Sequence, residues 1–262
     1  MTAAATGWPY PRVLAHRGGG TLAPENTLAA IRVGRDHGYR GFECDAMLAA
    51  DGIAVLIHDA TLERTTSGRG AVAATTARAL GQLDAGSWHG PRFRGEPVPT
   101  LADALALCRA ESIWVNVEIK PAPGHDDATG GTVARIVMQH YPGGAGGDAG
   151  RHRQQVPPAP LLSSFSVAAL GAARAAAPEL RRGLLCDRPP PDWRARLAAL
   201  QCVSLHCNHR AVDAALVAEV KAAGYWMLCY TVNDPDRAEQ LLAWGVDAIC
   251  TDRIDLIGPD GP

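Results

Sequence analysis

The stretch Gly41–Asp59, GFECDAMLAADGIAVLIHD, constrains the fold more than any other part of the chain. Glu43 and Asp45 stand one residue apart in a strand-like run, and alternate residues of a strand face the same side, so both carboxylates point one way. Two carboxylates on one face repel each other. The pair therefore indicates either a divalent cation held between the two side chains or a solvated, charge-paired surface.

The pattern around this stretch favours a parallel sheet. Short apolar runs alternate with Ala- and Leu-rich segments of helical length, which is typical of strands joined by helical crossovers. Without a hairpin arm at 54–57, about eight strands are expected, and no GxGxxG or GxxxxGK loop follows any of them. The unit count and the length of 262 residues predict an α/β protein of the (β/α)8 TIM barrel class.

One segment interrupts the alternation of strands and helices. Residues 60–98 are rich in glycine and proline and have little periodicity, so we expect a small insertion after strand two. The predicted organisation is a single TIM-barrel domain over 13–259 that contains this insertion. The first helix is expected to run from Pro24 to about His37, a later one is expected over Thr132–Gln139, and 141–160 is expected to be a surface loop.

Composition narrows the possible partners. The net charge is −2 and no run of Lys and Arg forms a basic patch, so the sequence predicts no nucleic-acid partner. No apolar run reaches the roughly 20 residues that a membrane span needs, and the first twelve residues lack a signal-peptide pattern, which predicts a cytoplasmic protein without membrane insertion. The seven cysteines are expected to be reduced and buried. A soft-metal site at Cys202, His206 and Cys207 is the weaker alternative.

Polar residues gather where the predicted strands end. In a barrel of this class the catalytic groups lie at the carboxyl ends of the strands. The early strands place seven charged or titratable residues there: His16, Arg17, Glu43, Asp45, His58, Glu118 and Lys120. The later strands bring Ser163, His206, Tyr230, Asn233 and Asp252 to the same end.

These side chains suit the chemistry of a phosphodiester. Three carboxylates, Glu43, Asp45 and Glu118, can form an all-oxygen site for Mg²⁺ or Ca²⁺. Arg17 and Lys120 can donate hydrogen bonds to phosphate oxygens. Two imidazoles, those of His16 and His58, can share general base and general acid duties in phosphodiester cleavage. Either histidine alone would more often be a structural hydrogen-bonding group.

Six short motifs follow one another along the chain. They are His16-Arg17-Gly18, Glu25-Asn26-Thr27, Glu43-x-Asp45, His58-Asp59, Glu118-x-Lys120 and Tyr230-Thr231-Val232-Asn233. In this order they resemble the motifs of a known family, the glycerophosphodiester phosphodiesterases. The similarity spans Val13 to about Pro259 and is greatest to the cytoplasmic bacterial enzyme associated with glycerol-3-phosphate uptake.

The resemblance implies a site and a reaction. It implies a divalent cation on the three carboxylates, His16 and His58 as the acid/base pair, and Arg17 and Lys120 on the phosphate of a small glycerophosphodiester. The implied products are glycerol 3-phosphate and an alcohol such as choline or ethanolamine. Tyr230, where many relatives carry Trp, would belong to the pocket wall. The sequence leaves the ion, the preferred alcohol and the oligomeric state open.

Two other functions fit parts of this pattern less well. A phospholipase-like barrel acting on intact lipid would need an apolar membrane-facing rim, and the sequence offers no basic amphipathic helix for docking. A non-catalytic phosphodiester-binding protein would bind its ligand without turnover, and two histidines at strand ends argue against it.

Overall fold

The computed structural model describes residues 7–143 and 157–261 of the chain. Within these residues, nine strands form one sheet. The strands are β1 (Val13–Ala15), β2 (Gly41–Leu48), β3 (Ala54–Leu56), β4 (Trp114–Ile119), β5 (Leu161–Ser164), β6 (Arg182–Cys186), β7 (Ser204–Asn208), β8 (Trp226–Tyr230) and β9 (Ala248–Thr251).

The sheet closes into a barrel. Its order is β1-β9-β8-β7-β6-β5-β4-β2-β3, and β1 also pairs with β2. Neighbouring barrel strands run parallel, whereas β3 is an antiparallel arm on β2. The predicted (β/α)8 class and the predicted hairpin arm are confirmed.

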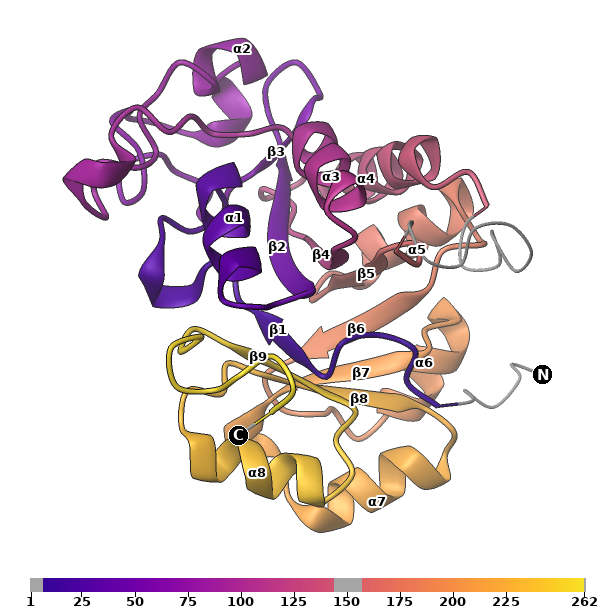
Figure 1. Ribbon diagram of the computed structural model, residues 1–262. Helices are drawn as coiled ribbons and strands as arrows, with labels where there is room; N and C mark the ends of the chain where they lie inside the picture. The colour runs from indigo at the N-terminus through magenta and orange to yellow at the C-terminus, as the bar shows by residue number, and fades with distance from the viewer. Residues whose placement is uncertain (1–6, 144–156, 262) are drawn as a thin grey trace.

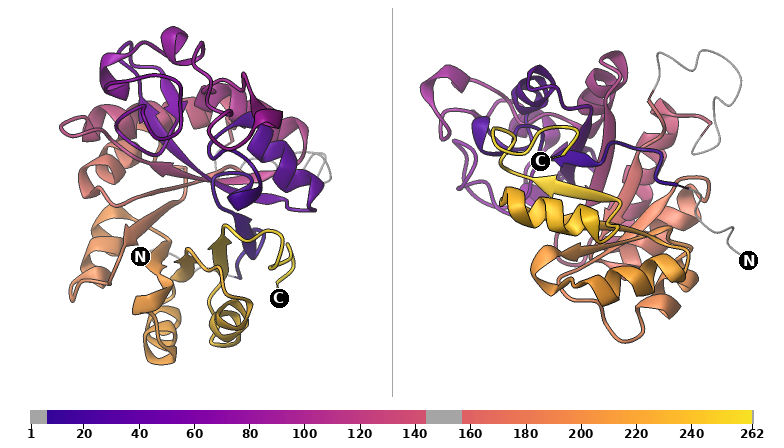
Figure 2. Two further views of the ribbon diagram at one scale, coloured as in Figure 1. Left: turned by 90° about the vertical axis from the view of Figure 1, so that its left-hand side faces the viewer. Right: turned by 60° about the horizontal axis from the view of Figure 1, so that its bottom comes forward.

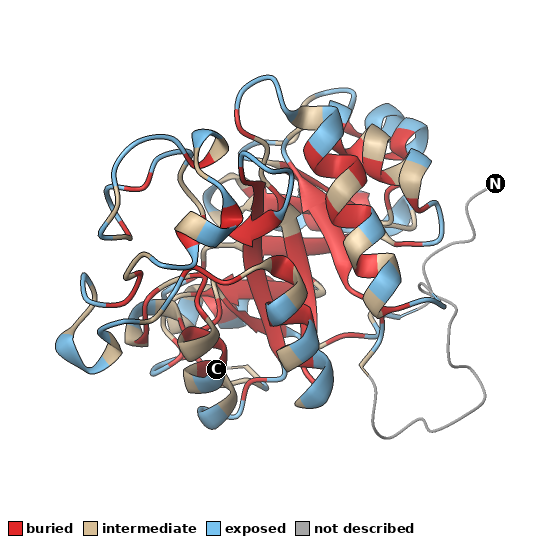
Figure 3. Ribbon diagram, turned by 90° about the horizontal axis from the view of Figure 1, so that it is seen from above, coloured by how far each residue is buried: buried red, intermediate tan, exposed pale blue. Residues whose placement is uncertain are grey.

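Helices surround the barrel (Figures 1 and 2), and the burial colours show buried strands inside helices that are exposed on their outer sides (Figure 3). The helices are α1 (Leu28–Asp36), α2 (Ala77–Leu80), α3 (Leu101–Ala110), α4 (Asp126–His140), α5 (Val167–Ala176), α6 (Trp193–Leu200), α7 (Ala214–Ala222) and α8 (Pro235–Ala243), with short 3-10 turns η1 (Gly20–Leu22), η2 (Val72–Ala74), η3 (Pro91–Phe93) and η5 (His209–Ala211). None of the helices in the described residues is both long and apolar enough to cross a membrane.

Two predicted helix starts are wrong. The first helix begins at Leu28 rather than Pro24, because Thr27 caps it and accepts a hydrogen bond from the Ala30 N–H. Asn26, just before the cap, has a left-handed φ of 59°, which no helix residue adopts. Asn26 instead turns its side chain toward Asp45 at the carboxyl end of β2.

The other wrong start concerns α4, which begins at Asp126 and not at Thr132. Gly130 and Gly131 lower the helix propensity of this stretch, which is why the sequence pattern hides the first turns. The structure needs Gly130, because a Cβ there would lie 2.1 Å from the carbonyl oxygen of Ala169 on α5. Close packing of two helices outweighs local propensity here. Of the predicted loop 141–160, residues 144–156 lie outside the described residues.

The segment between β3 and α3 contains only short helical turns, η2, α2 and η3, and lies at one end of the barrel (Figure 1). It has its own apolar cluster, which includes Leu62, Val72, Leu80 and Val98. The opposite end of the barrel, where strands begin, is closed by aromatic rings of Trp8, Tyr10, Trp114 and Trp226.

Candidate active site

The predicted site residues meet at the carboxyl ends of the first strands. Glu43 and Asp45 lie on β2, and Glu118 lies on β4 directly opposite Asp45 in the parallel register. His16 and Arg17 follow β1, His58 follows β3, and Lys120 follows β4, so barrel closure brings all of them to one end.

The three carboxylates form one compact cluster. An oxygen of each of Glu43, Asp45 and Glu118 lies within 4.8 Å of the others, and the first two side chains are buried. Burial and the charge of Asp45 raise the pKa of Glu43 well above its usual value, and raise that of Glu118 to about 7. Three close carboxylate oxygens are the donor set that hard divalent cations prefer, so the cluster fits Mg²⁺ or Ca²⁺.

Asp45 differs from its two neighbours because cations surround it. Burial acts to raise its pKa, but the charges of Arg17 and Lys120 outweigh burial and lower it. Asn26 adds to this support, since its Nδ2 donates to Asp45 Oδ2 at 2.8 Å and its Oδ1 accepts from the Asp45 N–H at 3.0 Å. Asp45 is therefore the carboxylate that the protein itself holds ionised.

His16 is held by a carboxylate on its outer nitrogen. Its Nδ1 lies 2.6 Å from Asp252 Oδ1, and its Nε2 lies 3.7 Å from Glu43 Oε2. Asn233 holds Asp252 in turn, by accepting from its N–H at 2.8 Å and by donating from Nδ2 to Oδ2 at 3.0 Å. The sequence placed Asp252 and Asn233 at this end of the barrel, but did not predict that they orient His16.

His58 has the same arrangement on the other side of the cluster. Its Nδ1 lies 2.6 Å from Asp59 Oδ1, and its Nε2 lies 2.8 Å from Lys120 Nζ. With a proton assigned to Nδ1, the free Nε2 lone pair accepts from the ammonium group. Burial lowers the pKa of His58 and so favours this neutral form. Both histidines thus turn Nε2 inward and Nδ1 toward an aspartate.

Arg17 joins the cluster to the first loop. Its Nε lies 3.3 Å from Asp45 Oδ2, and its guanidinium donates to Glu25 Oε1 at 2.8 Å. Burial opposes the charge of Arg17, but Asp45, Glu25 and Glu43 outweigh burial and raise its pKa. Arg17 therefore stays protonated beside the carboxylates.

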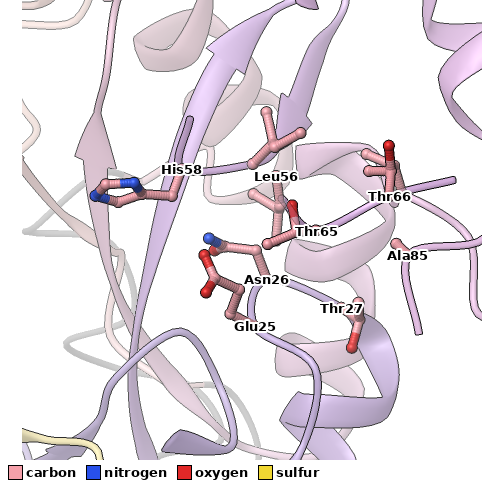
Figure 4. Close-up of a pocket in the computed structure, with 10 residues that line it drawn as sticks. Glu25, Asn26, Thr27, Leu56, His58, Thr65, Thr66 and Ala85 are labelled. Atoms are coloured by element: carbon pink, nitrogen blue, oxygen red, sulfur yellow. The ribbon is translucent and has the colours of Figure 1, made fainter. Parts of the chain in front are cut away.

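Arg64, in the segment after β3, is the contact that sequence reasoning missed. Its guanidinium donates to Glu25 Oε2 at 2.7 Å and, through Nε, to Asp59 Oδ2 at 2.5 Å. Glu25 and Asp59 are the partners of Arg17 and His58, so Arg64 connects both. Figure 4 shows Glu25 and Asn26 beside His58 in the pocket that Thr65 also lines. An arginine in an aperiodic segment carries no sequence signal of this role.

Tyr230 ends β8, across the barrel from β4, and lines a second cavity together with His16, Glu43 and Glu118. Its hydroxyl donates to the Cys186 carbonyl at 3.0 Å, and its ring meets the exposed Phe165 edge to face at 6.1 Å. Ser163 is buried and accepts from Asn116 Nδ2. The soft-metal alternative is wrong, because within the described residues the carboxylate cluster is the only group of three metal-ligating side chains.

A comparison with family models identifies the family of the chain. Residues 16–256 match the model of the glycerophosphoryl diester phosphodiesterase family. The chain belongs to this family. Family membership makes it an enzyme, a glycerophosphodiester phosphodiesterase.

Several similar proteins cover nearly the whole chain. A glycerophosphodiester phosphodiesterase of Caldanaerobacter subterraneus subsp. tengcongensis is 32% identical, over 92% of this chain and 93% of its own length. A phosphodiesterase of Oleispira antarctica, solved with the product sn-glycerol-3-phosphate, is 38% identical with a TM-score of 0.84, over 93% of both chains. A structure from Silicibacter pomeroyi DSS-3, described as a glycerophosphoryl diester phosphodiesterase, is 28% identical with a TM-score of 0.76, over 94% of this chain and 91% of its own.

Proposed function

We propose that this enzyme hydrolyses small glycerophosphodiesters, such as glycerophosphocholine or glycerophosphoethanolamine, to glycerol 3-phosphate and the free alcohol. The observation that carries the proposal is the pair of His–Asp contacts, each 2.6 Å long, that turn two imidazole Nε2 atoms toward one carboxylate cluster. The product complex of the Oleispira antarctica relative supports glycerol 3-phosphate as the phosphorylated product.

In this proposal Glu43, Asp45 and Glu118 hold a divalent cation, Mg²⁺ or Ca²⁺. The bound ion supplies charge stabilisation to the transferring phosphoryl group. The proximity of the three carboxylates supports this assignment, because burial and mutual repulsion make their shared ionisation costly without a compensating cation.

Arg17 and Lys120 bind the phosphate. Both are cations that already lie near Asp45, at 3.3 Å and 3.7 Å, and both side chains are partly accessible from the barrel opening. Arginine offers two parallel donors to phosphate oxygens and lysine offers a compact charge. Tyr230 provides an aromatic wall of the substrate pocket.

His16 and His58 move the protons. One imidazole accepts a proton at Nε2 from the attacking hydroxyl, and the other delivers a proton from Nε2 to the oxygen of the leaving alcohol. Asp252 and Asp59 hold each Nδ1–H and stabilise the imidazolium form when it arises. The attacking hydroxyl is water or a hydroxyl of the glycerol group, and phosphorus NMR of the first products separates the two.

The test is release of glycerol 3-phosphate from glycerophosphocholine. Activity should disappear with EDTA and return with Mg²⁺ or Ca²⁺. H16A and H58A should each reduce kcat by roughly 10²- to 10⁴-fold, the usual share of general acid–base catalysis, while circular dichroism stays unchanged. H37A, at the exposed C-cap of α1, is the matched control. Near-normal rates in both H16A and H58A would contradict the assignment.

Four points stay predictions from the sequence. They are the domain limits 13–259, the insertion 60–98, the cytoplasmic location and the absence of a nucleic-acid partner.

A further inference from the structure

Two buried polar atoms lie in the walls of the active-site cavity without a protein partner. They are Nδ1 of His206 and Oδ1 of Asn116, and neither has a hydrogen-bond partner among the described residues. Both side chains line the cavity that also contains His16, Glu43 and Tyr230. A buried polar atom without a partner is costly, so each marks a place that a polar ligand would stabilise.

The position of His206 is specifically built. It is fully buried on β7, and its Nε2 lies 2.9 Å from Ser204 Oγ. Gly183 on β6 makes room for the ring, because a Cβ at that position would lie 2.5 Å from His206 Nε2. The imidazole is therefore held inside the barrel, with Nε2 hydrogen-bonded to Ser204 and Nδ1 without a partner among the described residues.

Asn116 is held in a similar way on the opposite wall. It lies on β4 beside Glu43 of β2, and its Nδ2 donates to Ser163 Oγ at 3.1 Å. One terminal atom of the amide stays unpaired whichever way the amide is oriented. The cavity thus offers two polar atoms from two distant strands, each fixed by a neighbouring serine.

The surroundings select a neutral group. Burial lowers the pKa of His206 to about 3, so this ring carries no charge to attract an anion. Leu185 and Leu228 line the same cavity and suit carbon atoms rather than an anion. The cavity volume of about 40 Å³ admits only a small group. A hydroxyl both donates and accepts, so it can pair with the amide and with either tautomer of the imidazole.

We propose that His206 and Asn116 form a hydroxyl subsite inside the barrel, which binds the glycerol group of the substrate and of glycerol 3-phosphate. This proposal rests on the proposed function. It assigns the phosphate to the Arg17 and Lys120 side of the carboxylate cluster and the glycerol carbons to the apolar wall.

The test compares two ligands that differ only in hydroxyls, glycerol 3-phosphate and propyl phosphate. Their Kd values are measured by calorimetry on the metal-loaded enzyme. Binding is the chosen measurement because it does not depend on which hydroxyl attacks the phosphorus during the reaction. The wild type should prefer glycerol 3-phosphate by ~10-fold or more, since a site built for a hydroxyl rejects an analogue that lacks it. H206F and N116L should each raise the Kd of glycerol 3-phosphate by ~10-fold, and each should change the Kd of propyl phosphate by less than about 2-fold.

H37F makes the same chemical change at the exposed C-cap of α1 and should leave both Kd values unchanged. If H206F does not fold, as judged by its thermal melt, N116L carries the test from the opposite wall. An unchanged preference in the folded variants would overturn the subsite and leave only buried solvent on these atoms, with the proposed function intact. A wild type that neither releases nor binds glycerol 3-phosphate would overturn both proposals.

Discussion

Arg64 is the residue whose position adds most to the catalytic picture. It contacts neither the carboxylate cluster nor, in the proposed mechanism, the substrate, but its two carboxylate partners hold Arg17 and His58. Its side chain is 46% exposed, so these ion pairs contribute little to folding stability. Their importance lies in fixing the directions of two active-site groups.

We therefore expect R64Q to lower kcat about tenfold with a smaller change in KM, because a misplaced His58 affects proton transfer more than substrate binding. R64K should recover part of the loss, since it keeps a positive charge between Glu25 and Asp59. Steady-state kinetics with glycerophosphocholine measures the split. The control is R69Q, at an exposed arginine of the same segment. Equal kcat in R64Q and R69Q would remove Arg64 from the site.

His206 also makes the stability of the protein depend on pH. The folded state holds its pKa at about 3, whereas an unfolded histidine titrates near pH 6.5. Between these values the unfolded state binds the extra proton, so stability rises with pH and is lost as the pH falls below about 6.5. Above that pH the contribution is fully present.

The expected slope from this one residue is about 1.4 kcal/mol per pH unit within that window. Urea unfolding of the wild type and of H206F at several pH values isolates the contribution of His206. All other titratable groups contribute equally to both proteins, so the difference between the two curves belongs to this residue. H206F should show the shallower loss of stability between pH 6 and about pH 4. Parallel curves for the two proteins would mean that His206 is protonated or solvated in the folded state.

At the scale of elements, α4 and α5 show how one glycine sets a helix contact. Gly130 on α4 faces the Ala169 carbonyl of α5 so closely that a Cβ would lie 2.1 Å from it. Gly171 on α5 has open space, with no atom within 4 Å of its own Cβ position. Both glycines are in helices, so the two positions differ in packing and not in backbone conformation.

This contrast predicts opposite signs for the same substitution. G171A should stabilise the fold by up to about 1 kcal/mol, the usual gain of Ala over Gly in a helix. G130A should destabilise it by roughly 1–3 kcal/mol, because overpacking against backbone outweighs that gain. Urea denaturation followed by circular dichroism measures both. A stabilising G130A would show that α4 and α5 separate at little cost.

For the whole molecule, the barrel has one chemical end and one structural end. The carboxylates, histidines and cations lie where the strands finish, whereas four aromatic rings close the end where strands begin. Trp8 packs edge to face on Trp114 at 5.9 Å and on Trp226 at 5.3 Å, and its indole N–H donates to the Pro11 carbonyl. Trp8 and the residues that join it to β1 therefore belong to the packed structure.

W8A should consequently lower the free energy of unfolding by about 2 kcal/mol, less than for a fully buried tryptophan, since the ring is half-buried. At temperatures where the variant stays folded, its kcat should equal that of the wild type, because the rings lie at the end opposite the site. W88A, at an exposed ring in the segment after β3, should cost less than about 1 kcal/mol. A lowered kcat in folded W8A would contradict the separation of the two ends.

Local patterns in the sequence are enough to predict the barrel and the set of strand-end groups. Both depend on local regularities. The barrel follows from about eight apolar runs separated by segments of helical length. The carboxylates stand at alternate positions of β2, and strand geometry places them on a common face. Residue types at strand ends then limited the chemistry to cations, carboxylates and imidazoles around a phosphate. These properties depend only on residues that are close together in the sequence, so they can be predicted from it.

Which side chains pair with one another becomes clear only in the folded chain. Asp252 reaches His16 across 236 residues because β9 pairs with β1 when the barrel closes. Arg64 reaches Glu25, 39 residues before it, only after its aperiodic segment folds over the barrel. The start of α4 depended on a contact with another helix. Each of these contacts joins segments distant in sequence, so no local spacing or composition specifies it before the chain has folded.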